Sequence, residues 1–279
     1  MRYGVPHQST TEDQIILQKL KVNYIQSDLH WQSVEANLAS FEEAIWRIEG
    51  DSDLIILPEM FSTGFSMEAK ALAEPMNSKT FRWMKQQASQ TDAMILGSYI
   101  VQEKGSYFNR LFAVAPDGQH HTYDKRHLFA LAGEDEPYTQ GVKKLVFEWR
   151  SWRICPMICY DLRFPVWSRS ERKADELYEY DLLIYVANWP SPRIHAWDVL
   201  LQARAIENIA YTVGVNRVGL DENGYEYSGH SAIVDYTGKT LCRHDDDAGI
   251  GSAELDADLL QKFRARFPFQ ADSDQFQVL

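Results

Sequence analysis

Ile154-Cys155-Pro156-Met157-Ile158-Cys159-Tyr160-Asp161-Leu162-Arg163-Phe164-Pro165 is the stretch that decides the fold. Its first five residues form a continuous apolar run, as in a buried strand, and the run gives way to a more polar segment after Cys159. Open α/β sheets bind their ligands at the carboxyl ends of their strands. A thiol at such a strand end is therefore a candidate functional group.

Two other stretches end in the same way. Leu54-Ile55-Ile56-Leu57 runs into Pro58-Glu59-Met60, and a polar stretch ending in Tyr123-Asp124 presents Lys125. Strand ends at one edge of a sheet lie close together. We therefore expect one thiol, one carboxylate and one ammonium to converge on a single cleft.

Segments typical of strands and of helices alternate along the chain. Strands are expected at residues 20–25, 54–57, 93–101, 108–115, 145–149, 152–158, 181–187, 211–216 and 230–236, and helices at 31–48, 80–88, from 165 and at 197–210. This alternation, with hairpins interspersed, predicts an α/β fold in which helices lie outside a mixed sheet. The expected layout is a loose tail over 1–17, a single domain over 18–268 and a C-terminal tail over 269–279.

The composition excludes several classes of partner. A formal net charge of -12 would repel a phosphate backbone, so we expect no nucleic-acid partner. The opening residues 1–14 are polar and do not resemble a secretory signal, and no apolar stretch approaches the roughly 20 residues that a membrane helix needs. Three cysteines are too few for a secreted disulfide framework. We therefore expect a cytoplasmic protein.

Glu59, Lys125 and Cys159 supply three groups that amide hydrolysis requires. These are a nucleophile, a base that takes its proton, and a cation that holds the oxyanion. A free thiol has a pKa of about 8.5, so it needs a nearby base or cation to react near neutral pH. Each residue alone also has a plainer explanation: a buried cysteine, a carboxylate at a helix start and a surface lysine.

The segments around these three residues resemble the nitrilase superfamily of carbon-nitrogen hydrolases. Leu57-Pro58-Glu59-Met60-Phe61 is similar to its glutamate motif, residues 123–129 to its lysine motif and residues 159–165 to its cysteine motif. Residues 187–190 and 203–208 extend the resemblance, which covers roughly Leu20 to Phe267. The resemblance implies an αββα sandwich of mixed sheets with helices on the outer faces.

The resemblance also implies a role for each group. Cys159 would form a thioester, Glu59 would act as general base and acid, and Lys125 and the backbone N–H of Tyr160 would stabilise the oxyanion. A second glutamate would orient these groups. Both Glu134 and Glu136 are candidates, and Gly133-Glu134 followed by Tyr138 and Gly141 favours Glu134. No metal or organic cofactor is implied.

The lysine and cysteine motifs are most similar to the omega-amidase branch of the superfamily. Those enzymes use water to convert short dicarboxylate monoamides, such as 2-oxoglutaramate, 2-oxosuccinamate or succinamate, into the diacid and ammonia. The far carboxylate of such a substrate needs a cation. Arg163 is the candidate because a guanidinium binds a carboxylate bidentately, although a structural pair with Asp161 is the alternative. Arg193 is a weaker candidate.

Four aromatic residues are candidates for the walls of the substrate pocket. They are Phe65, Phe129, Tyr138 and Trp189, and each is equally compatible with a place in the core. The resemblance further implies a homodimer or a larger even assembly, paired through the face that carries the helix of the cysteine motif.

Other interpretations stay open at this point. A carbamoyl amino acid or a nitrile could be the substrate within the same superfamily, and a nonenzymatic scaffold is a third possibility. A Cys-His protease using His127, His195 or His230 fits less well, since no such signature surrounds Cys159. Packing is the default role for Cys155 and Cys242.

Overall fold

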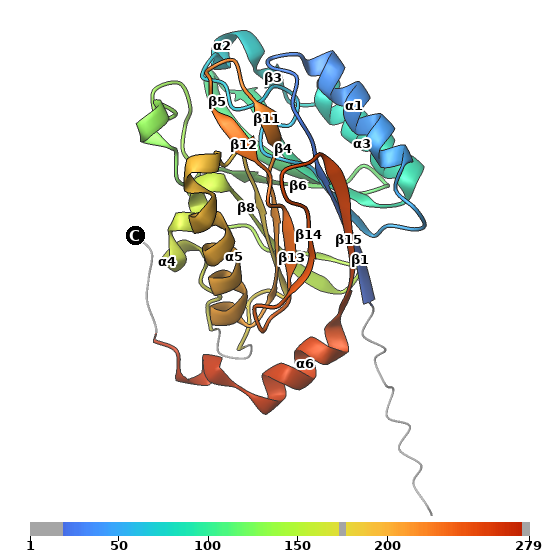
Figure 1. Cartoon of the computed structure of the whole chain (residues 1–279), viewed down its shortest axis with the longest axis vertical. Helices are drawn as coiled ribbons and strands as arrows, with labels where there is room; N and C mark the ends of the chain where they lie inside the picture. Colours follow the sequence, from blue (N-terminus) through green and yellow to red (C-terminus); the bar gives the residue numbers. More distant parts are fainter. Residues whose placement is uncertain (1–18, 173–176, 275–279) are drawn as a thin grey trace, which may run out of the picture.

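Two β-sheets pack face to face, and helices cover their outer surfaces (Figure 1). The computed structural model describes residues 19–172 and 177–274, so the expected tail over 1–17 lies outside the described residues. Helices α1 (Val34–Trp46) and α3 (Lys79–Thr91) lie on one sheet, and α5 (Ile194–Asn208) and the short α4 (Pro165–Ser168) lie on the other. The chain is therefore the αββα sandwich that its motifs imply.

The first sheet has the strand order β15-β1-β2-β4-β5-β6, with β3 beside β4. Its strands are β1 (Lys19–Gln26), β2 (Leu54–Ile56), β3 (Glu74–Pro75), β4 (Met94–Glu103), β5 (Ser106–Val114), β6 (His120–Asp124) and β15 (Gly249–Asp256). β1, β2 and β4 are parallel, whereas β5, β6 and β15 run antiparallel to their neighbours. A short helix, α2 (Ala69–Leu72), precedes β3.

The second sheet has the order β14-β13-β10-β9-β8-β7. Its strands are β7 (Phe147–Trp149), β8 (Trp152–Ile158), β9 (Leu182–Val186), β10 (Tyr211–Val215), β13 (Ala232–Val234) and β14 (Thr240–Arg243). β8 carries Pro156, which has no N–H to donate. Since β7 pairs only with residues 152–154, β8 has a neighbouring strand on one side only at Pro156, where proline is tolerated. A separate hairpin joins β11 (Val218–Leu220) to β12 (Glu226–Ser228).

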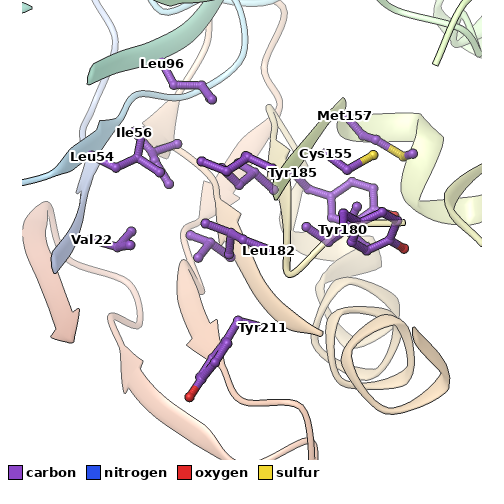
Figure 2. Packing of buried hydrophobic residues seen from close by; sticks show 14 of the residues in the cluster. Val22, Leu54, Ile56, Leu96, Cys155, Met157, Tyr180, Leu182, Tyr185 and Tyr211 are labelled. Atoms are coloured by element: carbon purple, nitrogen blue, oxygen red, sulfur yellow. The ribbon is translucent and has the colours of Figure 1, made fainter. Parts of the chain in front are cut away.

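The central parallel strands are apolar because both of their faces are buried. In β2, Leu54 and Ile56 belong to the cluster between the sheets, whereas Ile55 belongs to the cluster under α1 and α3. In β9, Leu182 points toward the first sheet and Tyr185 lies on the helix side (Figure 2). The continuous apolar runs of the sequence correspond to these doubly covered strands.

Helix α5 shows how closely the layers approach. It buries Trp197, Leu201 and Ala205, which are four residues apart and share one face of the helix. Opposite them, β10 carries Gly214, where a Cβ atom would lie 2.4 Å from Leu201 Cδ1. A side chain at this position would force Leu201 and Trp197 to move, so glycine allows the helix to pack this closely on the sheet.

Part of the C-terminal tail expected over 269–279 has regular structure. After α6 (Ala257–Arg266), residues Phe269–Asp272 form a 3₁₀ turn. Gln270 is buried there; its Nε2 donates to the Ser170 carbonyl at 2.5 Å, and its Oε1 accepts from Arg169 at 2.8 Å. These bonds tie residues 269–272 to the domain, and residues 275–279 lie outside the described part. No helix of the described ranges is long and apolar enough to cross a membrane.

Candidate active site

The expected carboxylate, ammonium and thiol lie close together, each just after the end of a strand. Glu59 follows β2, Lys125 follows β6 and Cys159 follows β8. Lys125 and Cys159 line a cavity of about 610 Å³, and Glu59 is fully buried behind Lys125. The ends of these strands, two from the first sheet and one from the second, thus bring together residues that are far apart in the sequence.

Lys125 lies between two carboxylates. Its Nζ donates to Glu59 Oε1 at 2.8 Å and to Glu134 Oε1 and Oε2 at 2.9 and 2.8 Å. All three side chains are at most 1% exposed. Glu136, the alternative second glutamate, is exposed. Glu134 is therefore the glutamate that belongs to this cluster.

Backbone and amide groups donate further hydrogen bonds to both carboxylates. The Phe129 N–H donates to Glu134 Oε2 at 2.6 Å, and the Asn188 N–H donates to Glu59 Oε2 at 2.8 Å. Asn109 Nδ2 reaches Glu59 Oε1 at 2.8 Å and Glu134 Oε1 at 3.2 Å. These bonds fix the orientation of both carboxylates, as buried charges require.

Asn109 and Asn188 had no assigned role in the sequence analysis. Asn188 follows β9 directly, so the rule that marked Glu59 and Cys159 could have marked it too. Asn109 is a fully buried amide within β5, where a strand face would ordinarily be apolar. In each case the signal was a polar side chain where the core pattern predicts an apolar one.

Gly141 packs closely against the backbone of the segment that carries Lys125. The Gly141 N–H donates to the Lys125 carbonyl at 2.8 Å. A Cβ at this glycine would lie 2.0 Å from the carbonyl oxygen of Asp124, so no other residue permits this approach. The close contact holds the segment of Lys125 against the irregular segment that contains Gly141.

Cys159 sits on a sharp turn between β8 and a 3₁₀ helix, Cys159–Arg163. Its φ of 44° lies in the left-handed region, which costs about 1–3 kcal/mol for a residue with a side chain. The Sγ lies 3.9 Å from the Asn188 carbonyl oxygen. The strained turn lifts the thiol out of the strand and into the cavity, where it is partly exposed.

Asp161 holds this turn. Its fully buried carboxylate accepts from the Ile158 N–H at 3.0 Å and the Tyr123 hydroxyl at 2.7 Å through Oδ2. Oδ1 lies 3.0 Å from the His127 backbone nitrogen and 2.7 Å from its Nδ1. Asp161 therefore joins the cysteine turn to the segment that flanks Lys125, and it forms no ion pair with Arg163.

The electrostatics of the cluster follow from its burial and its two carboxylates. Burial would lower the pKa of Lys125, but the charges of Glu134 and Glu59 outweigh it and raise that pKa. Burial and the neighbouring Glu59 raise the pKa of Glu134 against the pull of Lys125. Burial, and then the charge of Glu59, raise the pKa of the Cys159 thiol. These effects favour the protonated form of the Cys159 thiol.

Aromatic and apolar side chains form the walls of the cavity. Of the four aromatic candidates, Phe65, Phe129 and Trp189 line it. Tyr138 does not, because its hydroxyl donates to the Ser66 carbonyl at 2.6 Å and its ring packs against Met60 and Ile100. The remaining lining residues are Met67, Leu131, Ala132, Tyr160, Asn188, Pro190, Asp221, Asn223, Tyr225 and Tyr227. The last four come from the β11–β12 hairpin, which the sequence analysis did not anticipate.

Two arginines also line the cavity. The Arg163 guanidinium lies over the Trp189 ring at 5.0 Å, and that of Arg193 lies over the Phe129 ring at 5.1 Å. His127, His195 and His230 are not among the lining residues. Over the described part of the chain, no group of three metal-ligating side chains is placed to hold an ion.

The profile of the carbon-nitrogen hydrolase family matches residues 21–265, which include every group of this cluster. The chain belongs to the carbon-nitrogen hydrolase family. It is 45% identical to omega-amidase YafV of Yersinia enterocolitica, over 93% of this chain and 99% of that protein. It is 30% identical to 2-oxoglutaramate amidase of Bacillus subtilis, over 90% and 96% of the two chains.

A solved member of the CN-hydrolase superfamily has nearly the same backbone. XC1258 from Xanthomonas campestris is 39% identical and superposes with a TM-score of 0.91, over 94% of this chain and all of that one. Nit3 of Saccharomyces cerevisiae, a nitrilase superfamily member with 24% identity, shares the fold with a TM-score of 0.78 over 90% and 95% of the two chains. The nitrilase-like architecture is therefore established for this carbon-nitrogen hydrolase.

We predict that Asp161→Asn destabilises the protein by about 2 kcal/mol, because an amide replaces a charged acceptor of several hydrogen bonds. Urea unfolding followed by circular dichroism measures this loss. Asp135→Asn, an exposed acid of the neighbouring loop, is the matched control and should change stability by less than about 0.5 kcal/mol. Equal effects of the two substitutions would contradict the role given to Asp161.

We predict that alkylation of Cys159 by N-ethylmaleimide still accelerates as the pH rises past 9. Only the thiolate reacts, and a raised pKa keeps the thiolate fraction small over the range in which an ordinary thiol is already half ionised. Mass spectrometry of peptides at successive pH values measures the rate, and Cys159→Ala gives the background from other cysteines. A rate that levels off below pH 8 would contradict the raised pKa.

Proposed function

We propose that this protein is an amidase that hydrolyses the terminal amide of a short dicarboxylate monoamide such as 2-oxoglutaramate. The observation that carries the proposal is the placement of Cys159 beside the buried cluster of Glu59, Lys125 and Glu134, at the base of a cavity that also contains arginines. The names of the relatives, omega-amidase and 2-oxoglutaramate amidase, support the same class of substrate.

Acylation begins with proton transfer from the Cys159 thiol to Glu59. The sulfur attacks the amide carbon, and the carbonyl oxygen becomes an oxyanion that accepts hydrogen bonds from Lys125 Nζ and the Tyr160 N–H. Glu59 then gives its proton to the amide nitrogen, the C–N bond breaks and ammonia leaves. The substrate remains attached to Cys159 as a thioester.

Deacylation uses the same groups in the same order. Glu59, again ionised, takes a proton from a water molecule whose oxygen attacks the thioester carbon. The second oxyanion collapses, the C–S bond breaks and the sulfur recovers its proton from Glu59. The products are the diacid and the free enzyme. Lys125 keeps its proton throughout, because its two carboxylate neighbours raise its pKa.

Arg163 binds the far carboxylate of the substrate in this proposal. It lies three residues beyond the oxyanion donor Tyr160, and the Trp189 ring supports its guanidinium from one side. Phe65 and Phe129 enclose the reacting end and exclude bulk water. A cation at one end of the cavity and the thiol at its base would hold the amide with its carbonyl carbon at Cys159.

The cellular setting belongs to the same proposal. Cys155, Cys159 and Cys242 are all free thiols, which supports a reducing, cytoplasmic location. We infer a single domain over 18–268, because α6 near its end packs on the sandwich through the bond from Arg264 to Asp181. A homodimer formed through the face of α4 and α5 is the proposed assembly; Val166, Val199 and Ile206 are exposed apolar residues on these helices.

Cys159→Ala should abolish ammonia release from 2-oxoglutaramate, a loss of roughly 10⁴-fold or more, because no other group can form the thioester. Glu59→Gln should cost about 10²–10⁴-fold by removing the proton acceptor. Acid quenching of wild-type enzyme with substrate, followed by mass spectrometry, should show an acyl group on Cys159. Cys242→Ala is the matched control and should remain active. Activity in the Cys159 variant would refute the proposed nucleophile.

Arg163→Ala should raise the KM for succinamate by about 10–100-fold, the value of a charge-assisted hydrogen-bonded pair. Butanamide has the same length and no carboxylate, so its KM should change by less than about threefold. Steady-state ammonia assays on both amides measure the difference. An equal loss on the two substrates would remove Arg163 from the carboxylate-binding role.

A further inference from the structure

Two arginines that have no anionic partner in the described part of the chain line the cavity, whereas the far carboxylate of the proposed substrate needs only one. Among the described residues, neither Arg163 nor Arg193 forms an ion pair or a side-chain hydrogen bond, although both line the cavity. Two buried arginines elsewhere in the chain are paired with acids instead: Arg264 bonds to Asp181 at 2.5 Å and Arg110 to Asp124 at 2.6 Å. The two cavity arginines are therefore available to a ligand.

Each of the two guanidiniums stacks on an aromatic ring, and the two stacks are linked by a hydrogen bond. Arg163 stacks on the Trp189 ring, and Trp189 Nε1 donates to the Arg193 carbonyl at 2.8 Å. Arg193 in turn stacks on Phe129, whose ring meets the Tyr160 ring edge to face at 4.9 Å. Stacking fixes the plane of a guanidinium without using its N–H donors. Both forks are thus positioned before any substrate arrives.

An acid, Asp221, lines the cavity, and it offsets only part of the charge of the two arginines. Asp221 Oδ1 accepts from the N–H groups of Asn223 and Tyr225, both at 2.9 Å, and Oδ2 accepts from the Tyr227 hydroxyl at 3.0 Å. The residue is only 5% exposed. Asp221 is committed to the β11–β12 turn and to Tyr227. A positively charged substrate group would therefore meet two cations and one acid that is already engaged.

We propose that Arg193 determines specificity at C2 of the substrate: it donates to a 2-oxo oxygen and, with Arg163, excludes a 2-ammonium group. This inference rests on the proposed amidase function and names the substrate class more narrowly. A 2-oxo acid presents a carboxylate and an adjacent carbonyl oxygen, two acceptors for two guanidinium forks. An amino acid amide such as glutamine presents an ammonium at the same position, and like charges in a partly desolvated cavity repel.

The test compares three amides that differ only at C2: 2-oxoglutaramate, glutaramate, which has no C2 substituent, and glutamine. The measured quantity is kcat/KM for ammonia release by the wild type, Arg193→Gln and the matched control Arg163→Gln. We expect Arg193→Gln to lower the ratio of 2-oxoglutaramate to glutaramate by about tenfold, the value of one charge-assisted hydrogen bond. Arg163→Gln should lower kcat/KM for 2-oxoglutaramate and for glutaramate by the same factor, because both amides carry the far carboxylate.

The measurements with glutamine test the repulsion between its 2-ammonium group and the two arginines. The wild type should turn over glutamine at least 100-fold less efficiently than 2-oxoglutaramate, and Arg193→Gln should narrow that gap. Each ratio is taken on one enzyme sample, so any loss of folded protein cancels.

An unchanged ratio of 2-oxoglutaramate to glutaramate in Arg193→Gln, or wild-type glutamine turnover within tenfold of 2-oxoglutaramate, would overturn the inference. Either result would leave the amidase function standing. No ammonia from any of the three amides would refute the amidase function itself.

Discussion

The burial of Lys125 between Glu59 and Glu134 is the constraint on which the rest of this structure depends. Each ion loses several kcal/mol of hydration on entering the protein, and only close, fully bonded partners recover it. The Lys125 Nζ has both partners within 2.9 Å, and Asn109, Asn188 and the Phe129 N–H bond to the carboxylates. A lysine, two acids and two amides from separate segments must therefore be placed together. The sandwich meets this requirement with the ends of β2, β6 and β9, with the middle of β5 and with the loop that carries Glu134.

The composition of the cluster determines how the thiol is used. One ammonium faces two carboxylates, so the environment of Cys159 is dominated by negative charge and burial, and its pKa rises. A permanent thiolate would react with any electrophile that enters the cavity. A protonated thiol with a carboxylate as its base becomes nucleophilic only when the proton moves. In the proposed mechanism Lys125 then holds the oxyanion, so the ammonium that pairs with both buried carboxylates would also stabilise the transition state.

The sequence predicted the elements of the candidate site because Glu59, Lys125 and Cys159 each follow a strand-like stretch. Glu59 and Cys159 follow apolar runs that are buried on both faces. A continuous apolar run of this kind can be recognised in the sequence without coordinates. The pairing of β15 with β1 was not predicted, since Gly249 and Gly251 interrupt its apolar pattern and its partner lies more than two hundred residues away. Long-range pairing depends on the sheet as a whole and not on the segment.

The walls of the cavity were the least predictable part of the site, and the reason is physical. Whether an aromatic ring faces a cavity or the core depends on a single hydrogen bond or a neighbouring turn. Tyr138 lies in the core, where its hydroxyl donates to the Ser66 carbonyl. Phe129 has no hydroxyl and lines the cavity. The β11–β12 hairpin contributes its residues through a turn that Asp221 organises, and no periodic pattern marks it.

The cavity arginines follow a different rule from the arginines of the core. A buried guanidinium such as Arg264 needs a carboxylate, since without one its desolvation would be uncompensated. A guanidinium at a cavity wall keeps part of its hydration and gains support from an aromatic face, so it can remain without an anion. Phe129 and Trp189 supply these faces. The aromatic walls therefore do more than exclude water, because they keep two cations in position for an anionic substrate.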